Sequence, residues 1–148
     1  MMYYSGLLAL SQYVFEEEHS IGLGSDASMY LNEKEKYIRD TNNSKLGNLE
    51  VAVGTIIPTG EEAYCASHAR AYCDMLVEHL FDELKDLYFI AIDNYAVLNK
   101  ILLILRTNSL FNDKDIVEFL NNEFGSYFRG YLVRYGEEKA LSNLMNSN

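Results

Sequence analysis

The side chains best suited to chemistry in this sequence gather in one short stretch. This stretch holds both cysteines and two of the three histidines, which are Cys65, His68, Cys73 and His79. Thiolates and imidazoles bind zinc when four of them meet in a tetrahedron. On the continuous helix that the segment predicts, His68 and His79 would lie roughly 16 Å apart along the axis, too far for one ion to hold all four. We therefore expect structural roles for these residues and no cofactor, with a zinc site as the less favoured alternative.

A second chemical feature lies in the same predicted helix, where Glu83 follows His79 by four residues. At about 100° per residue, Glu83 falls on the buried apolar stripe and His79 lies one turn before it. A buried carboxylate needs a partner, so the simplest interpretation is a His79–Glu83 ion pair in or beside the core. The alternative is a metal or acid–base cluster that includes Asp86 and residues of another helix. We expect both side chains to be at least partly buried, and hydrogen-bonded to each other or bridged by an ion.

An acidic row occupies the face of this helix that points away from the stripe. Its members stand four residues apart and are Asp74, Glu78, Asp82 and Asp86. The spacing places a carboxylate every ~6 Å along the helix. This approximates the spacing of phosphates along a nucleic-acid strand, so the row could occupy a basic groove built for one. We expect the row to face solvent and to bind a partner; the alternative is an ordinary solvated face.

Tyrosine is abundant, with 12 residues, and three tyrosines alternate with arginines near the carboxyl end. The segment contains Tyr127, Arg129, Tyr131, Arg134 and Tyr135. Basic–aromatic segments stack on nucleobases, and tyrosine and arginine are also enriched in protein interfaces. We expect a core or interface role, in which Phe128 and Leu132 pack inward while both arginines stay accessible. Residues 126–135 fit a helix better than a strand, and both remain open.

No catalytic motif stands out in the sequence. It contains no Gly-x-Ser-x-Gly nucleophile elbow, no Gly-Lys-Ser/Thr phosphate loop, no Gly-x-Gly-x-x-Gly fingerprint after a strand and no His-Glu-x-x-His metal motif. With three histidines and two cysteines, few pairs of nucleophile and base can form. We therefore expect no enzymatic activity.

Apolar periodicity and turn residues predict the elements that position these groups. Expected helices cover residues 4–18, 25–38, 59–87, 93–105, 112–124, 126–135 and 137–145. Residues 49–57 are rich in β-branched side chains and predict a strand. The third helix begins at a Thr59-x-x-Glu62 capping box, with Asn112 as the cap of the fifth. The fourth is apolar nearly all round and is expected to form the centre of the core.

Length and composition indicate one folded domain over residues 1–148. The chain is 49% hydrophobic and 23% charged, which is typical of globular proteins. The fold class we expect is mainly α, a compact packing of five to seven helices with a minor β component near residues 49–57. Cys65 and Cys73 would lie roughly 12 Å apart on one helix, beyond the reach of a disulfide. Unpaired thiols, no secretory leader pattern and no long apolar run together predict a cytoplasmic protein.

The charge balance is the strongest indication of function. There are 22 acidic and 12 basic residues, a net charge of −10, and residues 61–93 alone carry eight acidic against two basic residues. Nucleic acids and anionic membranes repel such a protein. We therefore expect a non-enzymatic interaction protein that binds a basic groove on a partner protein. Inhibitors, immunity proteins and nucleic-acid mimics bind in this way, and the partner could itself be a nucleic-acid-binding protein. The alternatives are a metal-binding or enzymatic helical domain that uses His79 and Glu83, and a structural component that self-associates.

Overall fold

The computed structural model describes residues 1–15, 28–85, 87 and 95–146. The chain divides into two compact units, Met1–Met75 and Leu76–Asn148, and each is described by itself. Helices predominate and a small four-stranded sheet forms the β part, so the expected mainly α fold with a minor β component is confirmed. The expectation of one domain stays a prediction. Within the described residues, no helix combines the length and apolarity needed to cross a membrane.

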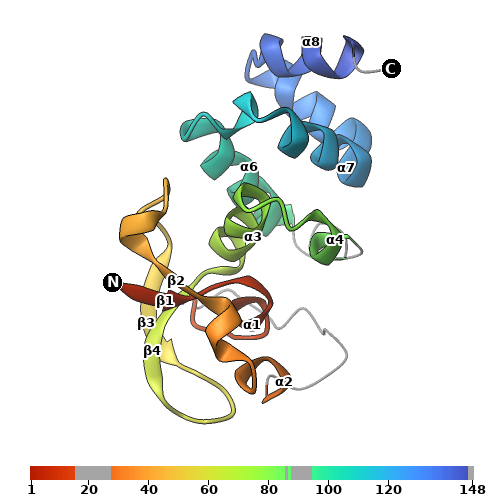
Figure 1. Ribbon diagram of the computed structural model, residues 1–148. Coiled ribbons are helices and arrows are strands. Elements are labelled where there is room, and N and C mark those ends of the chain that lie inside the picture. Colours follow the sequence, from red (N-terminus) through yellow and green to blue (C-terminus); the bar gives the residue numbers. More distant parts are fainter. Residues whose placement is uncertain (16–27, 86, 88–94, 147–148) are drawn as a thin grey trace. The chain divides into compact units, whose positions relative to one another are not determined.

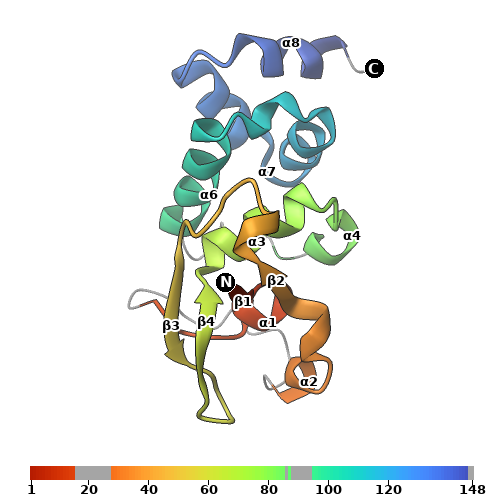
Figure 2. The same cartoon turned by 60° about the vertical axis from the view of Figure 1, so that its left-hand side comes forward.

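The sheet lies in the first unit. Its strands are β1 (Met2–Tyr4), β2 (Ile38–Asp40), β3 (Val51–Thr55) and β4 (Glu62–Ala66), in the order β2-β1-β4-β3. The β1 strand is antiparallel to β2 and parallel to β4, and β3 and β4 form an antiparallel hairpin, which Figure 2 shows as a two-stranded ribbon. The strand expected over residues 49–57 is confirmed as β3, but the other three strands were not expected.

The predicted helix start at Thr59 is wrong, because this segment forms the turn of the hairpin. The backbone N–H of Ile56 donates to the carbonyl of Glu61 at 2.8 Å, and that of Gly60 to the carbonyl of Ile56 at 2.7 Å. Gly60 has a φ of +78°, a conformation that glycine adopts without steric cost. The Thr59 hydroxyl accepts a bond from the N–H of Glu61 at 3.3 Å, inside this turn.

The helices of the first unit are shorter than the sequence predicts. They are α1 (Gly6–Leu10), α2 (Ser28–Leu31) and the larger part of α3 (His68–Val77), with 3₁₀ turns at Lys34–Tyr37 and Thr41–Asn43. Within residues 4–15, the helix expected over residues 4–18 is limited to α1, and residues 16–18 lie outside the described residues. The helix expected over residues 25–38 is divided into α2, a 3₁₀ turn and the start of β2, while the caps proposed at Ser25 or Asp26 lie outside the described residues.

Helix α3 begins at a different cap and is buried on every side. The Ser67 hydroxyl accepts a bond from the N–H of Arg70 at 3.1 Å, the geometry of an N-cap. Residues 68–76 are all buried, and Figure 1 shows α3 directly after β4. A helix buried all round has no solvated face on which an acidic row could stand.

The second unit is helical throughout its described residues. Its helices are α4 (Phe81–Leu84), α6 (Tyr95–Thr107), α7 (Lys114–Arg134) and α8 (Glu138–Asn146), with a 3₁₀ turn at Leu110–Asn112 (Figure 1). The helical interpretation of residues 126–135 is confirmed. Gly125, with φ 52° and ψ −125°, divides α7 into two helical stretches. Asp113 caps α7 in place of the predicted Asn112, since its carboxylate accepts bonds from the backbone N–H groups of Asp115 and Ile116.

Helix α6, expected at the centre of the core, contributes to the core of the second unit with one side only. One side packs inward, with Leu98, Ile101 and Leu105 each at most 1% exposed. Leu103 is 46% exposed, and its neighbours Asn99 and Lys100 are exposed as well. One face of α6 is therefore open to solvent despite its apolar composition.

Candidate functional site

The expected acidic row does not exist as a continuous stripe, because the helix that would carry it stops. Helix α3 ends at Val77, and His79 then adopts a left-handed φ of +58° while its N–H donates to the carbonyl of Leu76. Histidine is among the residues enriched in this conformation, which ends helices. The chain turns again into helix only at Phe81. Glu78 and Asp82 therefore do not stand on one helix.

Asp74 is 5% exposed and belongs to a buried polar network, so its predicted exposure is wrong. The Arg70 Nε donates to its Oδ1 at 2.9 Å, and the hydroxyls of Tyr3 and Ser5 donate to its Oδ2 at 2.6 and 2.7 Å. Burial and the Asp74 carboxylate raise the pKa of the Tyr3 phenol well above its ordinary value, which keeps it a donor. Arg70, fully buried, also donates to the carbonyl of Leu49 at 2.6 Å. This carboxylate holds the first unit together and cannot meet a partner.

The other three members of the predicted row are Glu78, Asp82 and Asp86. Glu78 and Asp82 are exposed. Asp86 lies outside the described residues. Two of the four predicted partner-binding residues are therefore at the surface of the second unit, on either side of His79.

The predicted pairing of His79 with Glu83 is also wrong. Both residues are exposed, because the break after α3 resets the helical register and removes Glu83 from the apolar stripe. The His79 Nε2 lies 2.7 Å from Asp113 Oδ2, and its Nδ1 lies 3.8 Å from Asp115 Oδ2. His79 therefore joins the segment before α4 to the start of α7.

The four residues considered for zinc are likewise dispersed. Cys65 lies on β4 and Cys73 on α3; both are buried, and neither forms a disulfide. The His68 Nε2 lies 2.7 Å from the backbone carbonyl of Gln12, and His79 pairs with carboxylates. The structural roles expected for His68 and the cysteines agree with this burial.

An open pocket of about 430 Å³ lies beside His79, within the second unit. We name it the acid–aromatic pocket, and it is lined by His79, Phe81, Asp115, Glu118, Phe119 and Asn122. The ring of Phe81 stacks between those of His79 and Phe119, with centroid distances of 5.0 Å on both sides. Asp115 and Glu118 are exposed. The pocket thus combines a column of flat rings with two solvent-accessible carboxylates.

The spacing along α7 brings the acidic and aromatic side chains to one face. Asp115, Glu118 and Asn122 follow one another at steps of three and four residues, which places them on one side of a helix. Asp113 stands at the N-cap, where the helix dipole favours a negative charge. None of the pocket residues except His79 was among the candidates expected from the sequence, although the spacing of residues 115, 118 and 122 is visible in it.

The electrostatics of Asp113 follow from its contacts. Burial acts to raise the pKa of this carboxyl, but the hydrogen bonds from His79 and from the N–H groups of Ile116 and Asp115 outweigh it and hold the pKa below its ordinary value. Asp113 is therefore a carboxylate at neutral pH, and it fixes the His79 ring at the edge of the pocket.

His79, Asp113 and Asp115 also satisfy the spacing of a metal site. Each offers a ligand atom, and these atoms lie within 4.8 Å of one another. Imidazole and carboxylate ligands suit zinc and other divalent ions. Both oxygens of Asp113 already accept hydrogen bonds, however, one from His79 and the other from the backbone.

Comparisons with models of protein families, with curated proteins and with solved structures found no match.

Proposed function

We propose that this chain is a non-enzymatic interaction protein that binds a basic segment of a partner protein through the acid–aromatic pocket. The observation that supports this is the exposure of Asp115 and Glu118 beside the stacked rings of Phe81 and Phe119. The binding residues proposed here differ from the acidic row expected from the sequence, because Asp74 is buried. The proposed partner is still a basic protein.

Arginine is the side chain that this pocket suits best. A guanidinium is planar, stacks on aromatic faces and forms paired hydrogen bonds with carboxylates. His79 and Phe119 cover the two faces of Phe81. The exposed His79 ring at the end of the column therefore offers the flat surface, while Asp115 and Glu118 offer the acceptors. Lysine presents a point charge and would use the carboxylates without matching the ring.

The surrounding charge favours the approach of a cationic partner. Glu78 and Asp82 are exposed in the segment that leads through His79 and Phe81, and the whole chain carries a net charge of −10. Long-range attraction of this kind speeds association and is weakened by salt. With Asp74 buried, an evenly spaced row of carboxylates is lacking, so an arginine-bearing segment is a better partner than a groove shaped for nucleic acid.

A titration with a defined probe tests this proposal. The probe is a synthetic nine-residue peptide with three arginines, and its control carries citrulline, which has the same shape without charge, at those positions. In NMR spectra of the ¹⁵N-labelled full chain, the arginine peptide is expected to shift the amides of Phe81, Asp115 and Glu118. The citrulline peptide is expected to bind about tenfold more weakly or worse, a loss of at least 1.4 kcal/mol. Equal binding of both peptides, or shifts confined to other residues, would overturn the proposal.

Metal binding by His79, Asp113 and Asp115 is the second candidate, favoured by the spacing of their ligand atoms. It retains His79 from the sequence-based alternative and replaces Glu83 by the two aspartates. Titration of Zn²⁺ into the full chain, with and without His79→Ala, separates the two candidates. A His79-dependent, stoichiometric uptake of zinc supports the metal site, and its absence removes it.

A further inference from the structure

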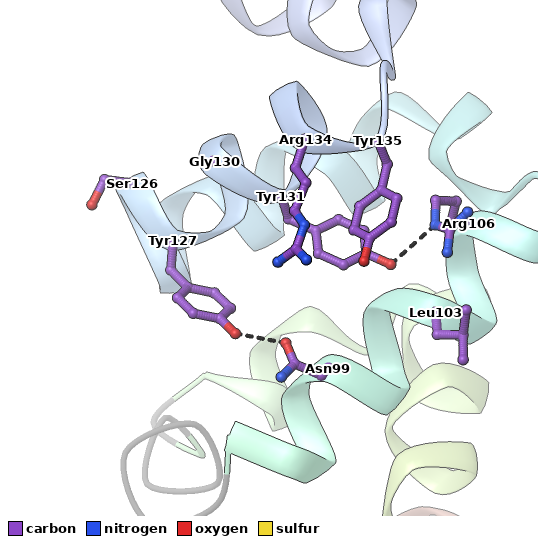
Figure 3. A pocket seen from close by; sticks show the side chains of 9 residues that line it. All are labelled: Asn99, Leu103, Arg106, Ser126, Tyr127, Gly130, Tyr131, Arg134 and Tyr135. Atoms are coloured by element: carbon purple, nitrogen blue, oxygen red, sulfur yellow. Dashed lines mark hydrogen bonds between the residues drawn. The ribbon is translucent and has the colours of Figure 1, made fainter.

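A second concave surface lies between α6 and α7, within the second unit. It is an open groove of about 590 Å³, lined by nine residues that include three tyrosines, two arginines and a glycine (Figure 3). This volume lies within the range of small-molecule sites, roughly 300–1,000 Å³. The exposed face of α6 that carries Asn99 and Leu103 forms one wall, which gives the unexpected exposure of Leu103 a role.

The two arginines give the groove a local positive charge. Figure 3 shows Arg134 extending from α7 into the space that faces α6, and Arg106 extending from α6. In the described part of the chain, no carboxylate lies within ion-pair distance of either guanidinium; Glu137 acts on Arg106 only through its field. The Arg106 Nε donates to the Tyr131 hydroxyl at 3.1 Å, which leaves its two terminal nitrogens for an anion.

The tyrosines give the groove flat surfaces. The guanidinium of Arg106 lies 4.1 Å from the ring centroid of Tyr135 and that of Arg134 lies 5.6 Å from it. Tyr127 is fixed at the other end, because its hydroxyl donates to Asn99 Oδ1 at 2.6 Å. This bond leaves the amide N–H groups of Asn99 able to donate. Ring stacking and amide donors are the means by which proteins hold nucleobases.

Gly130 lies on the surface of this groove, where the protein has no packing reason for a glycine. A Cβ at this position would meet no atom within 4 Å, and glycine within a helix costs about 1 kcal/mol relative to alanine. Because Gly130 has no side chain, the groove stays open between Tyr127 and Arg134.

The charge of this region differs from that of the rest of the chain. Residues 95–146 contain six basic and six acidic residues, so their net charge is zero, whereas residues 1–94 contain 16 acidic and six basic residues. An anion that the whole chain would repel is therefore less disfavoured in residues 95–146, which include the lining of this groove, than in residues 1–94.

We propose that the groove binds a small molecule in which a planar ring is joined to a phosphate, of the nucleoside monophosphate class. The guanidinium groups of Arg106 and Arg134 bind the phosphate oxygens, which they match in geometry. Tyr127 stacks on the ring, Asn99 donates to an acceptor on its edge, and Tyr135 positions the Arg106 guanidinium that lies over its own ring. The groove shares no residue with the acid–aromatic pocket, so this site is independent of the proposed function.

The test is an NMR titration of the ¹⁵N-labelled full chain with AMP, GMP, CMP and UMP. At least one nucleotide is expected to shift the amide of Gly130 and the Nε–H signals of Arg106 and Arg134, while the amides of Phe81 and Glu118 stay unchanged. Ribose 5-phosphate and the free nucleoside each lack one half of the ligand, and each is expected to bind about tenfold more weakly.

A matched pair of variants makes the result specific. Arg134→Gln removes a charge from the groove, and Arg129→Gln removes one from the same helix outside it, where Arg129 is exposed and bonded to Asn121. We expect the first to weaken binding about tenfold and the second less than about twofold. The proposal is overturned if no nucleotide shifts the groove at millimolar concentration, if both variants bind alike, or if a single-stranded oligonucleotide binds where no mononucleotide does.

Discussion

Arg70 and Asp74 illustrate at the level of single residues why spacing alone misplaced the acidic row. Opposite charges four residues apart on a helix can pair at the surface or in the interior, so their spacing does not show which way they face. Here the pair lies inside, with Arg70 fully buried and Asp74 5% exposed. The residues that decide this, Tyr3 and Ser5, lie about 70 positions away in sequence, and no local pattern reveals such partners.

Replacing Asp74 by Asn is expected to destabilise the fold strongly. The variant removes the negative charge that neutralises the buried Arg70, and breaking a buried ion pair costs about 3–5 kcal/mol. Asp82→Asn, which changes an exposed member of the same predicted row, is expected to alter the free energy of unfolding by less than about 0.5 kcal/mol. Urea denaturation followed by circular dichroism measures both. A loss below about 1 kcal/mol for the Asp74 variant would contradict the buried network.

The lowered pKa of Asp113 predicts that the stability of the fold decreases as the pH falls. Its folded-state pKa lies below the ordinary value, so its contribution is present above the unfolded-state pKa near 4 and is lost as pH falls through the folded-state pKa. Asp113→Asn keeps a good N-cap but lacks this titration. The difference in Tm between the parent chain and this variant is therefore expected to be largest above about pH 5 and to shrink toward about pH 2. A difference that is constant over this range would count against the His79–Asp113 interaction.

At the scale of elements, the sequence predicted the second unit well and the first poorly. Helices α6, α7 and α8 lie close to the predicted ranges, because each has a regular apolar stripe, although α7 joins two predicted helices and is capped by Asp113 in place of Asn112. The first unit depends on pairing between distant strands, as in β1 with β4. Thr59-x-x-Glu62 has the form of a capping box, yet hairpin pairing of β3 with β4 outweighs that local signal.

Substitutions of Ser67 and Thr59 distinguish the observed start of the helix from the predicted one. Ser67→Ala is expected to lower the free energy of unfolding by about 1 kcal/mol, since its hydroxyl satisfies the N–H of Arg70. Thr59→Ala, in the exposed hairpin turn, is expected to cost less than about 0.5 kcal/mol. Urea denaturation of both variants measures the contrast. The reverse order would support a helix that starts at Thr59.

Two glycines of α7 provide a matched test of its kink. Gly125 has a positive φ, so Gly125→Ala is expected to be destabilising by about 1 kcal/mol or more. Gly130 has open space around its Cα, so Gly130→Ala is expected to stabilise the helix by up to about 1 kcal/mol. Thermal unfolding followed by circular dichroism gives the sign of each change. Stabilisation by both variants would show that α7 is continuous through Gly125.

At the scale of the whole molecule, the sequence gives the net charge but does not show which acidic side chains are exposed and which lie close together. Asp74 is buried, Glu78 and Asp82 are exposed, and Asp115 and Glu118 join the site from a helix that starts about 30 residues later. The break at His79, which contains neither proline nor glycine, brings these groups to the acid–aromatic pocket. Composition therefore gives the net charge of the chain, whereas the positions of the charged side chains at its surface depend on the tertiary fold.

The most direct test of the proposed function compares two doubly neutralised variants. One carries Asp115→Asn and Glu118→Gln in the acid–aromatic pocket, and the other carries Glu62→Gln and Glu138→Gln, which are exposed and outside it. Both change the net charge by the same amount, so general attraction is matched. Affinity for the arginine peptide, measured by calorimetry at low salt, is expected to fall about tenfold or more in the pocket variant and less than about twofold in the control. Equal affinities in the two variants would contradict the proposal that the pocket binds basic partners.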